Sequence, residues 1–74
     1  MFSKGFINTA SVRNDWQAQD LKKQGKKFEQ CVHIEKVGDQ YFAYMGAHLN
    51  SNLIGSALSH REAKKGARAW FNAQ

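Results

Sequence analysis

The last third of the chain carries its clearest hydrophobic pattern. Small and aromatic residues recur there at spacings of four, seven and eight positions: Ala63, Ala67, Trp70 and Phe71. At about 100° per residue these positions fall on one arc of a helix, as on a buried face. Ser59 precedes them, and Glu62 follows three residues later, which is the spacing of a capping box. We therefore predict a C-terminal helix that starts after Ser59 and packs through its two aromatic residues.

The middle of the chain alternates polar residues with β-branched or aromatic ones, which is typical of strands. We predict strands over residues 28–37, 40–46 and 53–58. Turn residues separate them at Gly38-Asp39 and at Asn50-Ser51-Asn52. Such short connections predict an antiparallel meander.

Residues 11–24 consist mostly of good helix formers, and Gly25 follows as a natural stop. Trp16 is the largest apolar residue in this segment, and we expect it to anchor the helix. Residues 1–10 show no helical period, which predicts a tail or an arm whose aromatic residues dock on the core. The predicted fold is a single α+β domain over residues 11–74. It has an αβββα order, with a three-stranded antiparallel meander packed in two layers against the C-terminal helix, whose side the N-terminal helix shares.

Composition narrows the class of protein. A chain of 74 residues is one domain, and its single cysteine cannot form an internal disulfide. No apolar run approaches the roughly 18 residues of a membrane span, and the opening residues lack a signal-peptide pattern. We expect a mature cytoplasmic chain that starts at Met1, has no membrane association, and is a monomer or a homodimer.

The distribution of Lys and Arg residues suggests a candidate binding surface. The net charge is +5, and the predicted C-terminal helix carries four cations on the arc beside its apolar face: Arg61, Lys64, Lys65 and Arg68. A second basic group lies in the last turn of the first predicted helix and just after it: Lys22, Lys23, Lys26 and Lys27. A cationic surface of one sign favours a polyanionic partner, nucleic acid before an acidic membrane. The plainer interpretation is an ordinary solvated helix face.

The amino-acid sequence of residues 53–69 resembles that of the double-stranded-RNA-binding domain family, whose members share the αβββα order. The resemblance lies in a third strand with Gly55, a Ser59 cap, two basic residues, and Glu-Ala-Lys followed by small residues. It implies that His60, Arg61 and Lys64 occupy the positions of the family's phosphate-contacting lysines. The family's Gly-Pro and histidine in the first inter-strand loop are absent, since Gly38-Asp39 stands there.

The strand–strand–strand–helix order also resembles the arm-type DNA-binding domains of integrases, which read DNA with the sheet, but the outer face predicted here is not notably basic. The aromatic residues of the second strand favour an alternative, a protein-interaction module or inhibitor of a nucleic-acid-handling complex, of the kind that mobile elements encode. The six acids are scattered, so we predict no enzyme. Cys31 and His33, with His48 and His60, lack zinc-site spacing, so no metal or cofactor is predicted.

Overall fold

The computed structural model describes residues 2–5, 10–46 and 52–74, with the side chains of residues 13–23 in the first helix. The element order is β1 (Ser3–Lys4), α1 (Ala10–Lys23), α2 (Phe28–Cys31), β2 (Val32–Val37), β3 (Gln40–Met45), β4 (Leu53–Ala57) and α3 (His60–Asn72). The remainder of the predicted arm, residues 6–9, lies outside the described residues, as do His48 and the first two residues of the predicted turn at Asn50.

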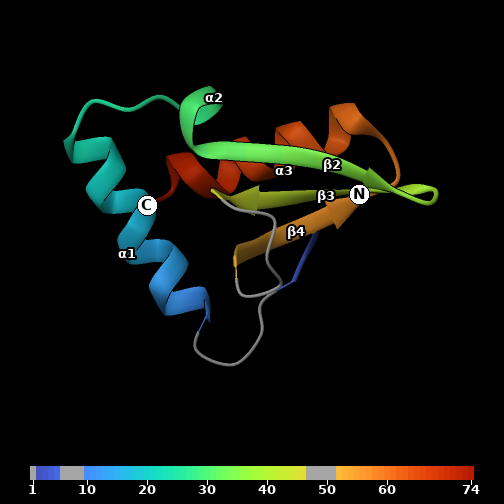
Figure 1. Ribbon diagram of the computed structural model, residues 1–74, viewed down its shortest axis with the longest axis horizontal. Coiled ribbons are helices and arrows are strands. Elements are labelled where there is room, and N and C mark those ends of the chain that lie inside the picture. The colour runs from blue at the N-terminus through green and yellow to red at the C-terminus, as the bar shows by residue number, and fades with distance from the viewer. Residues whose placement is uncertain (1, 6–9, 47–51) are drawn as a thin grey trace.

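One antiparallel sheet and the long helix α3 form the two layers (Figure 1). The strand order is β1-β4-β3-β2, so the sheet has four strands and the prediction of three was incomplete. The additional strand comes from the predicted arm, where Ser3 pairs with Ser56 and Lys4 with Gly55. Two residues with an exposed face carry no periodic signal, because the alternation that marks a strand needs four or more positions.

The chain turns from β2 to β3 through two residues, as predicted. Val37 pairs with Gln40 across Gly38-Asp39, and Gly38 adopts a φ of 64°. A left-handed conformation is common in two-residue hairpin loops, because it matches the twist of the flanking strands. This hairpin makes β2 and β3 direct neighbours over their whole length.

A bulge interrupts the pairing of β3 with β4. Ala43 pairs with Gly55 and Tyr44 with Leu53, so Ile54 is the extra residue on β4. Its side chain is fully buried in the core. The bulge therefore directs two successive residues of β4, Ile54 and Gly55, toward α3.

The predicted first strand begins four residues too early. Residues Phe28–Cys31 form the short helix α2, in which Gln30 Oε1 accepts a hydrogen bond from the Lys27 N–H at 2.9 Å. Both Phe28 and Cys31 are buried in the core. A strand would direct residues three positions apart to opposite faces, whereas a helical turn directs both inward.

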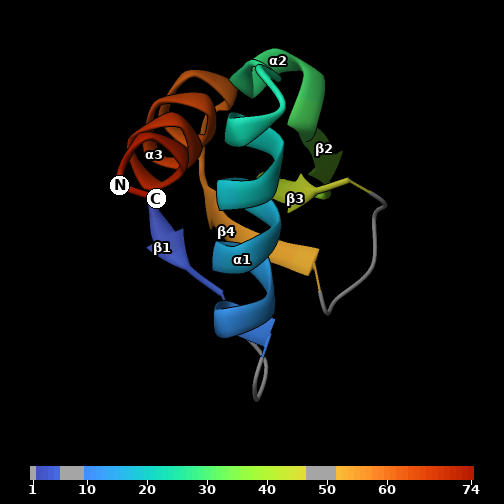
Figure 2. The ribbon, with the colours of Figure 1, turned by 90° about the vertical axis from the view of Figure 1, so that its left-hand side faces the viewer.

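Helix α1 crosses the end of the sheet where β3 finishes and β2 and β4 begin, beside the C-terminal end of α3 (Figures 1 and 2). It ends at Lys23, just before the predicted stop at Gly25, which has a φ of 80°. The Lys26 N–H donates to the Leu21 carbonyl and the Gly25 N–H to the Lys22 carbonyl, both at 3.0 Å. These two bonds define a Schellman motif.

The expectation that Trp16 anchors α1 is wrong. Its side chain is 65% exposed, and Ala18 and Leu21 make the core contacts instead. Asn14 is fully buried, and its amide has no hydrogen-bond partner among the described residues. Helical spacing explains why Ala18 is buried and Trp16 is not. Ala18 lies on the same side of the helix as the buried Asn14, whereas Trp16 lies about 160° around the helix from Asn14.

Candidate nucleic-acid interface

The core fixes the orientation of α3 about its own axis. Ser59 caps the helix, with its Oγ accepting the Glu62 N–H at 3.1 Å, which confirms that half of the predicted capping box. The predicted apolar face is buried against the sheet: Ala63, Ala67, Trp70 and Phe71. With this face inward, the basic positions of the helix are directed to solvent.

All four predicted cations of α3 are exposed and lie together. Arg61, Lys64, Lys65 and Arg68 line one shallow hollow on the helix surface, which Ala69 and Asn72 complete. We call these four side chains the α3 cation row. Arg61, Lys64 and Lys65 form no ion pair with any residue in the described part of the chain.

The fourth cation of the row is paired. Arg68 Nη2 lies 2.8 Å from Glu29 Oε1, and its guanidinium lies 5.2 Å from the centre of the Phe28 ring. The pKa of Glu29 is lowered, first by a backbone hydrogen bond to its carboxylate and then by the charges of Arg68 and Lys64. Both partners come from the turn of α2, which the sequence pattern did not predict. A separation of 39 residues leaves no local signal for this pair.

Lys22, from the second basic group, has a structural role. Its Nζ donates to the carbonyl oxygens of Gln74 at 2.6 Å and Phe71 at 3.3 Å, and lies 5.7 Å from the centre of the Phe71 ring. A cation at these carbonyls complements the negative end of the helix dipole of α3. Lys22 is thereby held at the end of the helix.

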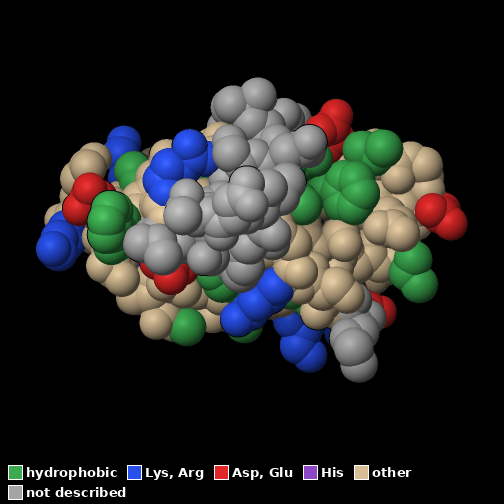
Figure 3. Space-filling model, turned by 90° about the horizontal axis from the view of Figure 1, so that it is seen from below, with side chains coloured by type: hydrophobic (Ala, Val, Ile, Leu, Met, Phe, Trp, Pro, Cys, Tyr) green, Lys and Arg blue, Asp and Glu red, His purple; other side chains and the backbone are tan. Residues whose placement is uncertain are grey.

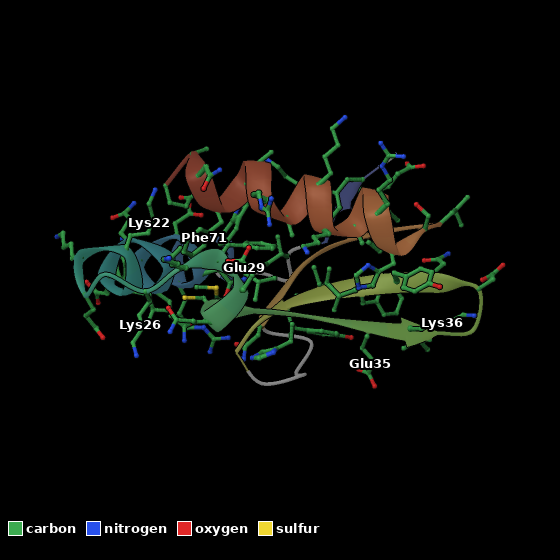
Figure 4. The ribbon with its side chains drawn as sticks, turned by 90° about the horizontal axis from the view of Figure 1, so that it is seen from above. Lys22, Lys26, Glu29, Glu35, Lys36 and Phe71 are labelled. Carbon is green, nitrogen blue, oxygen red and sulfur yellow. The ribbon has the colours of Figure 1, made fainter. Side chains whose placement is uncertain are left out.

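The other three lysines of that group, Lys23, Lys26 and Lys27, are exposed. They lie at the end of α1 and in the connection to α2, at the end of the molecule where Phe71 and Glu29 also lie (Figure 4). The two basic groups thus approach each other at the C-terminal half of α3. His60 lies at the opposite end of α3, where its ring meets Tyr41 edge to face at a centroid distance of 5.8 Å.

On the face seen in Figure 3, Lys and Arg side chains lie singly, with acidic and uncharged side chains between them. Phe42 and Tyr44 form an edge-to-face pair, at a centroid distance of 6.5 Å, on the sheet face opposite α3. Tyr41 and Phe42 therefore point to opposite faces, as the predicted alternation requires.

The described residues contain no group of three or more His, Cys, Asp or Glu side chains that could hold a metal ion, and Cys31 and His33 belong to different elements. No helix in residues 10–46 or 52–74 combines the length and apolar character needed to cross a bilayer.

No protein-family model, curated protein sequence or solved structure matches this chain.

Proposed function

We propose that the protein binds nucleic acid through the phosphate backbone, with the α3 cation row as the contact surface. One observation carries the proposal: four exposed cations of one helix line a single hollow, and only Arg68 among them is held by an acid in the described residues. Residues three or four apart on a helix are neighbours on its surface. The row therefore brings four cationic side chains onto one patch, with neighbouring Cβ atoms about 5–6 Å apart, and this patch can face the densely charged phosphate backbone.

The contact favours the backbone over the bases. Lysine and arginine on a convex helix surface reach phosphate oxygens without entering a groove, and such contacts carry little sequence information. The exposed lysines Lys23, Lys26 and Lys27 extend the basic surface beyond Arg68, and His60 and Arg61 mark its other end. Lys22 contributes to folding instead, because the carbonyls at the end of α3 hold its ammonium group.

Titration of the protein with duplex RNA and duplex DNA at two or more salt concentrations tests the proposal. Each neutralised phosphate releases counterions, so log K should fall with log salt with a slope of about −3 if the three unpaired cations of the row all engage. The double change Lys64→Gln and Lys65→Gln should reduce that slope by about 2. No binding at low salt would refute the proposal.

A charge-matched control separates the row from the net charge. The double change Lys4→Gln and Lys36→Gln removes two exposed cations from β1 and β2 and lowers the net charge equally. It should leave the salt slope nearly unchanged. Equal losses in the two double variants would assign binding to overall charge and would contradict a role for the row.

A further inference from the structure

The strand β2 forms an edge of the sheet with an accessible backbone. It ends the strand order, and no strand of the described residues pairs with its outer side. It is also the most exposed of the three long strands, with only Val32 fully buried. An edge of six residues presents unpaired N–H and C=O groups that another extended chain can use.

The hairpin determines which residues present these groups. Residues that flank a two-residue turn form a hydrogen-bonded pair, so the odd-numbered residues of β2 bond to β3. The Gly46 N–H donates to the Cys31 carbonyl at 3.0 Å, which follows the same alternation. Ile34 and Lys36 therefore direct their N–H and C=O groups outward. The outward N–H of Val32 is already bonded to the Phe28 carbonyl.

A hollow runs beside this edge, between β2, α2 and the first half of α3. It is lined by Phe28, Glu29, Val32, His33, Ile34, His60 and Lys64. Figure 4 looks onto the edge, with α3 on one side of β2 and Glu35 pointing to the other side. Every second side chain of an added strand would point toward α3 and enter or border this hollow.

The charges on the side of β2 that faces α3 indicate which kind of strand can pair with this edge. The added side chains would lie near the ammonium groups of Lys64 and Lys36, and the one acid lining the hollow, Glu29, is paired with Arg68. A second copy of β2 would place its own Lys36 on this side, and like charges across a strand pair are unfavourable. A strand with carboxylates at alternate positions is complementary instead.

We propose that the β2 edge binds an extended acidic segment of a partner protein, which adds a fifth strand and directs its carboxylates toward Lys64 and Lys36. Main-chain hydrogen bonds to Ile34 and Lys36 supply register, and the hollow beside α3 selects the alternate side chains. The strand pairing depends on the backbone of β2 and not on phosphate contacts, whereas the carboxylate contact shares Lys64 with the α3 cation row, so nucleic acid and the acidic segment would compete at that side chain.

The probe is an acetylated and amidated peptide of four Thr-Glu repeats, titrated to millimolar concentration into isotope-labelled protein. Amide exchange should slow at Ile34 and Lys36 and stay unchanged at Glu35, whose N–H already bonds to β3. A peptide of four Thr-Lys repeats should give no protection. Changes confined to α3, or none at all, would refute the proposal, and protection that appears on self-association without peptide would assign the edge to a second copy.

Removal of single backbone N–H donors tests the strand pairing. Lys36→Pro removes an outward N–H without removing a bond to β3, and Lys36→Thr removes the same charge while keeping the N–H. The proline variant should bind the acidic peptide at least about five-fold more weakly than the threonine variant. On unaltered protein, a Thr-Glu peptide with alternate backbone N-methyl groups should lose binding. Equal affinities in either comparison would overturn strand addition.

Discussion

Lys22 and Phe71 join the C-terminal ends of α1 and α3. The Lys22 Nζ lies 3.3 Å from the Phe71 carbonyl oxygen and 5.7 Å from the centre of its ring, while donating to the Gln74 carbonyl at 2.6 Å. One lysine of α1 thereby donates to carbonyl groups at the end of α3, including that of Phe71, which also accepts the Gln74 N–H at 3.2 Å. The contact also fixes the position of α1, which has little apolar surface of its own.

Replacing Lys22 with methionine should lower the free energy of unfolding by about 1 kcal/mol, because the α3 carbonyls lose a charged donor. Its apolar contact with Phe71 is kept. Lys23→Met removes a neighbouring exposed cation and should cost less than about 0.5 kcal/mol. Urea denaturation of both variants makes the comparison, and equal losses would show that Lys22 acts only through its position at the end of α1.

Glu29 restrains the α3 cation row. Glu29→Gln breaks the ion pair with Arg68 and should raise affinity for duplex nucleic acid by about two- to five-fold at low salt, since one more cation becomes available. Asp39→Asn makes the same charge change in the turn between β2 and β3, outside the ion pair with Arg68. Filter binding or fluorescence anisotropy at matched ionic strength decides the question, and an unchanged affinity for Glu29→Gln would mean that Arg68 takes no part in binding.

Gly66 and Gly55 hold the Phe2 ring between α3 and β4. A Cβ added at either glycine would overlap that ring. Gly66→Ala should therefore destabilise the domain, although the same change in an open helix stabilises by roughly 1 kcal/mol. In a Phe2→Gly background, which removes the Phe2 Cβ as well as the ring, the ordinary gain should return. Thermal unfolding of the four proteins in this cycle measures the coupling, and a gain in both backgrounds would contradict the packing of Phe2.

The two tryptophans should differ in stability and in fluorescence. Trp16 is 65% exposed and Trp70 is 5% exposed. Trp16→Ala should cost less than about 0.5 kcal/mol, whereas Trp70→Ala should cost about 3–5 kcal/mol. In single-tryptophan variants, acrylamide should quench Trp16 strongly and Trp70 weakly. Similar quenching of both would show that α1 packs differently from the arrangement described.

Cys31 should contribute to alkaline destabilisation. Burial raises the pKa of its thiol above the usual 9.0, and the Lys26 charge offsets only part of that change. Because the folded pKa is higher, the unfolded chain loses this proton first. The stabilisation is complete below about pH 9 and is lost as pH rises through the folded value. Between pH 8 and 10, unfolding free energy should fall more steeply with Cys31 than in Cys31→Ala, and parallel slopes would contradict this.

Local chemistry made much of the fold predictable. The Ser59 cap, the Gly25 stop, the Gly38-Asp39 turn and the apolar arc of α3 each depend on neighbours within about eight residues, and each was confirmed. α2 was missed because four residues cannot show a period. Trp16 was misplaced because size suggested burial, whereas tertiary packing selected Ala18 and Leu21 for the core.

The residues of the candidate site also divide into those that local sequence predicts and those that it does not. The four cations of α3 were identified from helical spacing, since the buried arc of the same helix determines what remains outside. Their distant partners could not be predicted. Glu29 reaches Arg68, and Lys22 reaches Phe71, only because α1 and α2 fold back over the end of α3.

The packing of the Phe2 ring between α3 and β4 also has an evolutionary consequence. The Phe2 ring fits against α3 only because Gly66 lacks a side chain, so substitutions at positions 2 and 66 are physically linked. Gly55 stays constrained even without the ring, because a Cβ there would also overlap the Ser3 carbonyl oxygen. Among related sequences, positions 2 and 66 should therefore change together. A lineage that gains alanine at position 66 should already have lost the ring at position 2.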